Sequence, residues 1–208
     1  MINGINIDIK LIFAISGTII LVIGAFLPYL RDIFLRKTKP HAYTWLIWTI
    51  TQSTAVAGLI YGKGGWGALS LTIGTAFVFL VFLLSLKYGT KNITKSDTIV
   101  LIAALSAIVV WWQLNNPLLA VLMVSVIDVL GYIPSFRKIF KEPWTETAIS
   151  WLFFCLTSIF SMLALEEYNL LTLTYIVTIT SVNISFLAVC LIRRRIVPRP
   201  SSDLKTAI

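Results

Sequence analysis

Long apolar stretches separated by short polar segments make up most of the chain. Seven such stretches of 16 to 23 residues can be marked out, and about 20 apolar residues are enough to cross the hydrocarbon core of a bilayer as a helix. The pattern therefore predicts an all-α membrane protein with seven transmembrane helices. The expected helices are Leu11–Leu30, Ala42–Tyr61, Trp66–Leu86, Thr98–Leu114, Leu118–Ile133, Ala148–Leu165 and Leu170–Ile192.

Composition agrees with this pattern and excludes a water-soluble fold. The 208 residues are 58% hydrophobic and 12% charged, with a mean hydropathy of +0.89, whereas soluble domains are about one-quarter charged. Seven helices leave no room for a separate soluble domain. Residues 1–10 carry one cation, Lys10, and no small-residue cleavage pattern, so we expect the first helix to be retained. Cys155 and Cys190 lie inside apolar runs, where a thiol acts as a small hydrophobic group.

Basic residues predict the orientation in the membrane. With seven crossings, 15 of the 17 Lys and Arg residues fall on one side, and Lys10 and Lys63 fall on the other. Cations collect on the cytoplasmic side of membrane proteins. We therefore expect a plasma-membrane protein with its N-terminus outside and its C-terminus in the cytoplasm. The Arg193–Arg195 cluster could be a contact with anionic lipid or an ordinary stop-transfer cluster, and we favour the stop-transfer cluster.

The chain contains an internal repeat at an offset of 106 residues. Positions 28–51 and 134–157 share 8 identities in 24 positions, among them Pro28 with Pro134 and Trp45 with Trp151. One helix lies between the repeated units, so both start on the same side of the membrane, as in parallel transporter repeats. The predicted organisation is a three-helix unit in 1–97, a linker helix in 98–116, a second three-helix unit in 117–195 and a cytoplasmic tail in 196–208.

Each unit has a helix with a proline near its cytoplasmic end, a basic loop, and a second helix that opens with an aromatic residue. The segments Pro28-Tyr29-Leu30-Arg31 and Pro134-Ser135-Phe136-Arg137, with this topology, resemble the PQ-loop superfamily, which includes the SWEET and SemiSWEET sugar transporters. The glutamine that often follows the family's proline is Tyr29 or Ser135 here, so sugar specificity is not implied. The Trp45-x-x-Trp48 pair is also similar to bacterial nicotinamide riboside transporters. The resemblance implies alternating access to a central site between the two units.

Aromatic and amide side chains on the second helix of each unit are candidates for that site. Trp45, Trp48 and Gln52 are spaced to share one helix face, and Phe154 and Thr157 lie on the equivalent helix of the second unit. Aromatic faces beside an amide suit a flat polar solute. For Trp45 and its partner Trp151, near a helix start, we favour the interfacial aromatic belt. Trp48 and Gln52 lie deeper, which favours a pocket.

Asn183, near the middle of the last helix, is a further candidate. The resemblance implies that an asparagine here contacts solute, whereas helix packing would equally explain a buried amide. The matched residue in the first unit is Phe77, with Thr75 nearby. The predicted solute-binding residues are therefore Asn183, Trp48, Gln52, Thr75, Phe154, Thr157 and Ser181.

Asp128 and two prolines are candidates for coupling and gating. Asp128 lies about ten residues into an apolar run, where a carboxylate is costly and is often a proton relay or a ligand. A structural pair with Arg31 or Arg137 is the alternative. Pro28 and Pro134 are hinges of an inner gate or terminators of their helices.

Catalytic and cofactor chemistry have no support in the sequence. There is no metal-ligand spacing, nucleophile triad or phosphate-binding glycine loop, and we expect His41 to be a solvated loop residue. The leading hypothesis is a transporter for a small polar solute, without metal or other cofactor and without nucleic acid partners. Its expected partners are the lipid bilayer and the solute, and a homo-oligomer is compatible with this plan. The alternative is a binding or sorting receptor on the same fold that does not transport.

Overall fold

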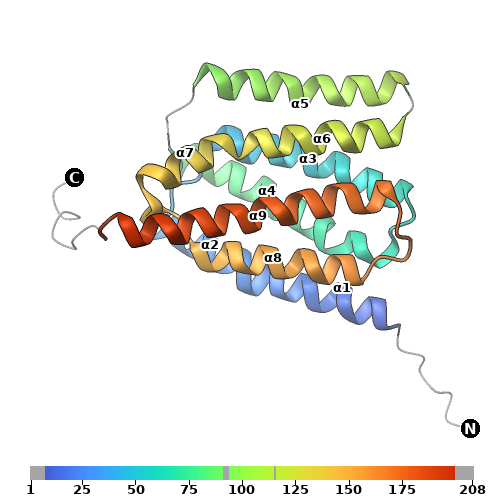
Figure 1. The fold of residues 1–208 in the computed structure, drawn as a ribbon, viewed down its shortest axis with the longest axis horizontal. Coiled ribbons are helices and arrows are strands. Elements are labelled where there is room, and N and C mark those ends of the chain that lie inside the picture. The colour runs from blue at the N-terminus through green and yellow to red at the C-terminus, as the bar shows by residue number, and fades with distance from the viewer. Residues whose placement is uncertain (1–7, 91–93, 115, 200–208) are drawn as a thin grey trace, which may run out of the picture.

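The computed structural model describes residues 8–90, 94–114 and 116–199. The described residues form helices joined by short connections, with no β-strand among them. The helices lie alongside one another, and α1 begins at one end of the bundle whereas α9 finishes at the other (Figure 1). The structure thus confirms the expected all-helical architecture.

The helices follow the apolar stretches of the sequence closely. Each of the seven predicted segments is helical over most of its length, and Ala42–Tyr61 has the predicted bounds. Four helical segments run beyond their predicted C-terminal ends, to Phe34, Tyr88, Lys141 and Ile196. The elements are α1 (Ile9–Ile19), the π-helical η1 (Ile20–Phe26), α2 (Leu27–Phe34), α3 (Ala42–Tyr61), the 3-10 turn η2 (Gly65–Gly67), α4 (Ala68–Tyr88), α5 (Lys95–Leu114), α6 (Pro117–Gly131), α7 (Ile133–Lys141), the 3-10 turn η3 (Pro143–Thr145), α8 (Ala148–Leu163) and α9 (Leu170–Ile196).

Four helical segments of the described chain are long and apolar enough to cross a bilayer: Ile9–Phe34, Gly65–Tyr88, Pro117–Lys141 and Leu170–Ile196. The apolar helix α8 is shorter. Large apolar side chains remain exposed on the outside of the bundle, for example Ile23 and Val126. Because water does not favour such a surface, it indicates contact with lipid.

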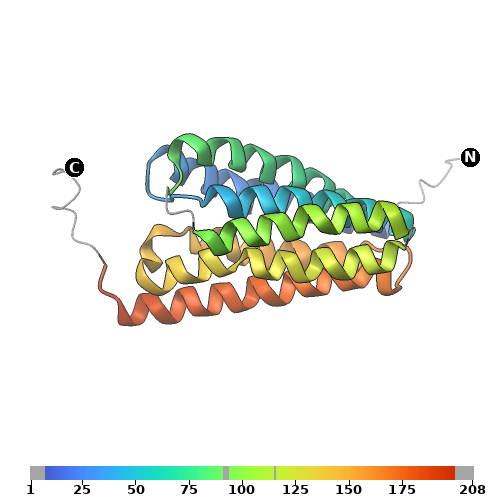
Figure 2. The ribbon, with the colours of Figure 1, turned by 90° about the horizontal axis from the view of Figure 1, so that it is seen from above.

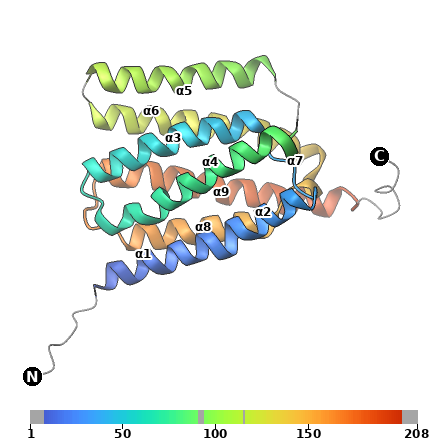
Figure 3. The ribbon, with the colours of Figure 1, turned by 180° about the vertical axis from the view of Figure 1, so that it is seen from behind.

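Helix packing brings together segments that are distant in sequence. Helix α4 packs against α3 and α1, and α9 packs against α8 and α6. Between these groups, α3 contacts α6, and α1 contacts α8. Helix α5 lies at the edge of the bundle and contacts α6 and α3 (Figures 2 and 3). The interior is therefore shared by elements of both halves of the chain.

Polar residues at the helix starts set several boundaries. The Asn116 side chain accepts the backbone N–H of Leu119 at the start of α6, and Asn169 forms a reciprocal cap with Thr172 at the start of α9. His41 is the N-cap of α3 and accepts the backbone N–H of Thr44 at 3.4 Å. The expectation of a solvated His41 is wrong, because its side chain is buried in this cap.

The prolines at matched repeat positions, Pro28 and Pro134, lie where the helical backbone is irregular, and a helix continues after each of them. The π-helical turn η1 directly precedes Leu27 and Pro28, and α2 continues to Phe34. Between α6 and α7 the α-helix is interrupted at Tyr132, two residues before Pro134, and α7 continues to Lys141. Proline removes a backbone donor, and such irregular turns accommodate the loss. Helix therefore continues on the far side of each proline, which fits a bend at these points better than an exit into a loop.

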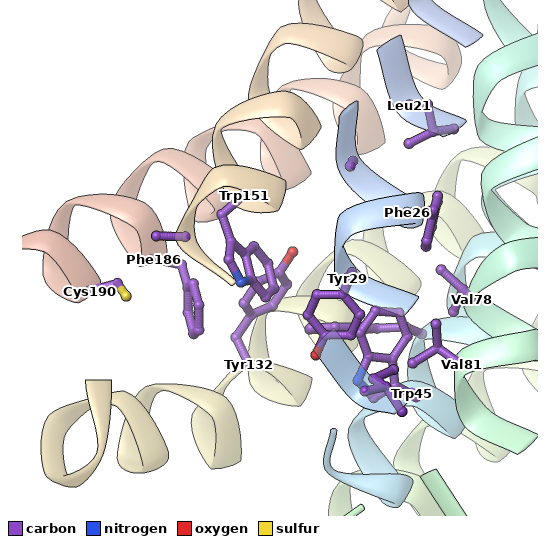
Figure 4. Close-up of a cluster of buried hydrophobic side chains, with 14 of the residues drawn as sticks. Leu21, Phe26, Tyr29, Trp45, Val78, Val81, Tyr132, Trp151, Phe186 and Cys190 are labelled. Carbon is purple, nitrogen blue, oxygen red and sulfur yellow. The ribbon is translucent and has the colours of Figure 1, made fainter. Parts of the chain in front are cut away.

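Aromatic residues dominate the core toward the α2 and α7 end of the bundle. Tyr29 and Trp45 of one half converge there with Tyr132, Trp151 and Phe186 of the other (Figure 4). Trp45 and Trp151 are 3% and 2% exposed. The aromatic-belt interpretation of these two tryptophans is therefore wrong, because belt residues lie at the lipid interface.

Candidate functional site

A cavity of about 80 Å³ lies between the helices of the two halves of the chain. Its walls come from η1, α3, α4, α8, α9 and the break at Tyr132. Every lining residue is uncharged, and apolar and polar side chains both contribute. They are Leu21, Phe26, Trp45, Trp48, Gln52, Ser70, Leu71, Gly74, Val78, Tyr132, Trp151, Phe154, Thr157, Ser158, Ser161, Tyr175, Ile176, Ile179 and Asn183.

Asn183 and Tyr132 form the most specific polar contact of the cavity wall. The Tyr132 hydroxyl donates to Asn183 Oδ1 at 2.6 Å, and both residues are buried. Among the described residues, this is the one hydrogen bond of the Asn183 side chain, which leaves its NH₂ donors for a solute. The Gln52 side chain also lines the cavity. The predicted roles of Asn183 and Gln52 fit this geometry.

Aromatic rings form another part of the cavity wall. Trp48 packs against Tyr132 with ring centroids 4.5 Å apart, and Trp45 packs against Trp48 at 5.1 Å. The indole Nε1 of Trp48 is buried and has no hydrogen-bond partner within the described part of the chain. A buried indole N–H normally finds a partner. Trp48 thus brings an aromatic ring to the cavity wall, while its unpaired Nε1 lies close to Gly131 of α6.

The aromatic cluster closes the cavity toward the α2 and α7 end. Trp151 and Phe186 lie 4.1 Å apart, and Tyr29 and Trp45 lie 5.2 Å apart, measured between ring centroids. We call Tyr29, Trp45, Tyr132, Trp151 and Phe186 the aromatic plug. Figure 4 shows that these rings come from both halves of the molecule, so the plug bridges the two halves.

Positions separated by 106 residues make corresponding contacts across the cavity. Phe26 stacks on Phe77 at 4.9 Å and meets Phe154 edge-on at 5.1 Å. Tyr132, 106 residues after Phe26, contacts Asn183 and Trp48, which are 106 residues from Phe77 and Phe154. One side of the cavity is therefore apolar where the other is polar.

The predicted solute-binding residues separate into two groups. Asn183, Trp48, Gln52, Phe154 and Thr157 line the cavity. The Thr157 hydroxyl donates to the backbone carbonyl of Gly17 at 3.3 Å. Thr157 therefore also links α8 to α1.

Thr75 and Ser181, also predicted to bind solute, do not line the cavity. Ser181 is exposed on the outer face of α9 and donates to the carbonyl of Val177. Thr75 donates to the carbonyl of Leu71 one turn earlier. Both lie one or two residues from cavity positions in sequence, but the 100° rotation per helical residue turns them away.

Asp128 lies behind the cavity wall. Its Oδ1 accepts hydrogen bonds from the hydroxyls of Thr51 and Tyr175, the latter at 3.2 Å. Tyr175 itself lines the cavity. No ion pair joins Asp128 to Arg31 or Arg137 in the described residues, and Arg31 pairs with Asp32. The predicted structural ion pair is therefore wrong, and the carboxylate is linked to the cavity through Tyr175.

Sequence reasoning missed several cavity residues, chiefly Tyr132, Tyr175, Ser70 and Ser161. Tyr132 has a signal, since it is a polar-tipped residue matched to Phe26 just ahead of Pro134. Serines have none, because they occur throughout membrane helices as packing residues.

The chain matches no protein-family model, no curated protein and no solved structure. No group of three or more His, Cys, Asp or Glu side chains in the described ranges could hold a metal ion. Functional inference therefore depends on the cavity and on the contacts of its wall.

Proposed function

We propose that this protein is a membrane transporter for a small, uncharged polar solute. The observation that carries the proposal is a cavity with free amide donors and aromatic walls, enclosed between two halves of the chain. The uncharged lining favours a neutral solute, because a charged one would lose its hydration without an opposite charge in the wall. Aromatic faces would stack on flat parts of the solute, and Asn183 and Gln52 would bind its polar groups.

The packing of the helices supports a duplicated, seven-span architecture with a linker helix. In each proposed unit the third helix packs against the other two: α4 against α1 and α3, and α9 against α6 and α8. The contacts between units also correspond, since α3 meets α6 as α8 meets α1. These pairs are those that a rotation exchanging the two units would produce, and alternating access by rocking of repeats uses such a plan.

The shape of the cavity supports movement as part of function. A volume of about 80 Å³ holds a few water molecules but is smaller than common ligand sites. The aromatic plug closes one end, and irregular backbone precedes Pro28 and Pro134 near that end. Opening at these points would admit or release solute on the plug side.

Charge supports an orientation with the plug on the cytoplasmic side. The basic loops and the Arg193–Arg195 cluster lie at the α2 and α7 end, and Lys10 and Lys63 lie at the other end. A reporter domain fused after Lys63 should then read outside the cell. A reporter fused after Lys91, a residue outside the described ranges, should read inside. If both reporters lay on the same side of the membrane, the seven-span topology would be contradicted.

Counterflow in proteoliposomes tests the function. Purified protein is reconstituted into proteoliposomes, and these are loaded with one of a panel of unlabelled neutral solutes. Accumulation of the matching labelled solute inside them is then measured. Accumulation that disappears in Asn183→Ala is expected. Saturable binding without counterflow would instead favour a receptor on this fold. The proposal would be contradicted if sugars, nucleosides and neutral amino acids all showed no binding and no counterflow.

A further inference from the structure

A network of polar side chains lies just beyond the aromatic plug, at the α2 and α7 end. The Lys138 ammonium on α7 is 2.6 Å from Glu146 Oε1, in the segment before α8. The two side chains are only 14% and 4% exposed. A pair this well buried is strongly sensitive to loss of one partner, unlike an exposed surface pair.

Glu146 connects this ion pair directly to the plug. Its second oxygen, Oε2, accepts the indole N–H of Trp151 at 3.3 Å. Arg194 of α9 donates to the backbone carbonyl of Glu146 at 2.5 Å. The position of the Trp151 ring is thus tied to a residue whose own position depends on α7 and α9.

Lys138 also reaches across to the first half of the chain. Its ammonium donates to the carbonyl of Lys39 at 2.8 Å, in the loop before α3, and to that of Thr145 at 3.2 Å. All three ammonium donors therefore have partners. Lys138 lies on α7, which begins directly after the break at Tyr132. A bend at Tyr132 would therefore move the contacts that Lys138 makes with both halves of the chain.

The matched position of the first unit makes a reciprocal contact. Asp32, 106 residues before Lys138, accepts the hydroxyl of Thr147 at 2.9 Å. Thr147 lies next to Glu146 in the second half, and its hydroxyl is also 2.8 Å from that of Thr38. Each segment that follows a proline is therefore bound to the loop of the opposite unit.

We propose that Glu146 is a positioning residue that latches the inner gate closed. Glu146, held by Lys138, fixes Trp151 in the plug. The contacts of Asp32 on α2 and of Lys138 on α7 with the opposite units make α2 and α7 release together. This inference rests on the proposed transport function, because it assigns the plug to the gate of that pathway. Breaking the Glu146–Lys138 pair shifts the protein toward a form open at the plug end.

A native thiol reports this opening. Cys190 Sγ is buried and lies 3.7 Å from the carbonyl of Pro143, directly beneath the segment that leads to Glu146. The chain has two cysteines, so Cys155→Ala leaves Cys190 as the sole thiol. Movement of this segment would expose Cys190 to a small water-soluble maleimide.

The experiment compares maleimide labelling rates of Cys190 in detergent solution, without any solute. In the Cys155→Ala background, Glu146→Gln should raise the rate by at least about tenfold, as expected for a broken buried pair. Lys138→Met with Glu146→Gln should give a similar rate, since the two changes remove one interaction and are not additive. Arg195→Gln is the matched control, because it removes an exposed cation at the same end of the bundle, and it should leave the rate unchanged.

A second reporter separates gate opening from loss of structure. Ser161→Cys, in a background with Cys155→Ala and Cys190→Ala, places a thiol in the cavity wall on α8, ten residues beyond Trp151 of the plug. Glu146→Gln should slow labelling at this position, because the other end closes as the plug opens. Faster labelling at both positions, or no change at Cys190, would overturn the latch. Labelling needs no solute, so these outcomes are independent of the counterflow result.

Discussion

The two sides of the cavity use the same contact positions for different chemistry. On the α1 and α4 side, Phe26 stacks on Phe77 with centroids 4.9 Å apart. On the α6 and α9 side, the positions 106 residues later hold Tyr132 and Asn183, joined by a hydrogen bond of 2.6 Å. The apolar pair contributes only packing, whereas the polar pair can present donors and acceptors to the cavity.

This difference indicates how a duplicated scaffold would acquire a one-sided site. Packing at matched positions keeps the two halves in register, so either pair satisfies the helix contacts. Only one side needs polar groups to orient a solute. Solute recognition would therefore depend on Tyr132 and Asn183, and much less on Phe26 and Phe77.

The largest expected effect comes from removing the amide of the polar side. Asn183→Ala should abolish solute binding, because it removes the donors and the partner of Tyr132 at once. The protein should remain inserted and monodisperse, since one interhelical hydrogen bond contributes only about 0.6 to 2 kcal/mol in membranes. Binding by the purified variant and its elution in size-exclusion chromatography check this. Phe77→Leu is the matched control on the apolar side, and equal loss of binding in both would remove the distinction between the sides.

Asp128 allows a test of coupling on the same polar side, since its matched residue is Val22. Asp128→Asn should retain solute exchange but lose acceleration by an inward proton gradient, because the amide keeps the shape and cannot titrate. Uptake into proteoliposomes with and without an imposed pH gradient measures this. Glu166→Gln, at an exposed position of the opposite end, is the control. An unchanged pH response of Asp128→Asn would leave this carboxylate a purely structural role.

A moderate effect is expected from making the polar side resemble the apolar one. Tyr132→Phe removes the hydroxyl that orients Asn183 and keeps the ring packed against Trp48. Solute binding should weaken about 3- to 30-fold, which corresponds to roughly 0.6 to 2 kcal/mol. Equilibrium binding of the solute found by counterflow gives the value. An affinity as high as that of the unaltered protein would show that Asn183 needs no orienting partner.

The smallest effect is expected at the two hydroxyls that face away from the cavity. Ser181→Ala and Thr75→Val should each change binding by less than about twofold, because their side chains donate to backbone carbonyls of their own helices. The same binding assay checks both variants. A tenfold loss in either would mean that its helix rotates toward the solute in another conformation.

Much of the helix layout could be predicted from the chain alone. Ala42–Tyr61 has the predicted bounds, and α6 begins at Pro117, one residue before the predicted start at Leu118. These features depend on local chemistry, since apolar length and proline placement act within one segment. Trp45 shows the limit of such reasoning. Its place near a helix start suggested the lipid interface, but packing against Tyr29 buries it.

Hydropathy, charge and the 106-residue register follow from the sequence by itself, because the bilayer imposes the same demand on every segment. The tertiary structure alone decided which polar groups meet. Asp128 contacts Thr51 and Tyr175 rather than an arginine, and Ser181 faces outward although Asn183, two residues later, lines the cavity. The reason is physical: the rotation of a helix about its axis is set by the side chains of its neighbours, and these come from distant parts of the chain.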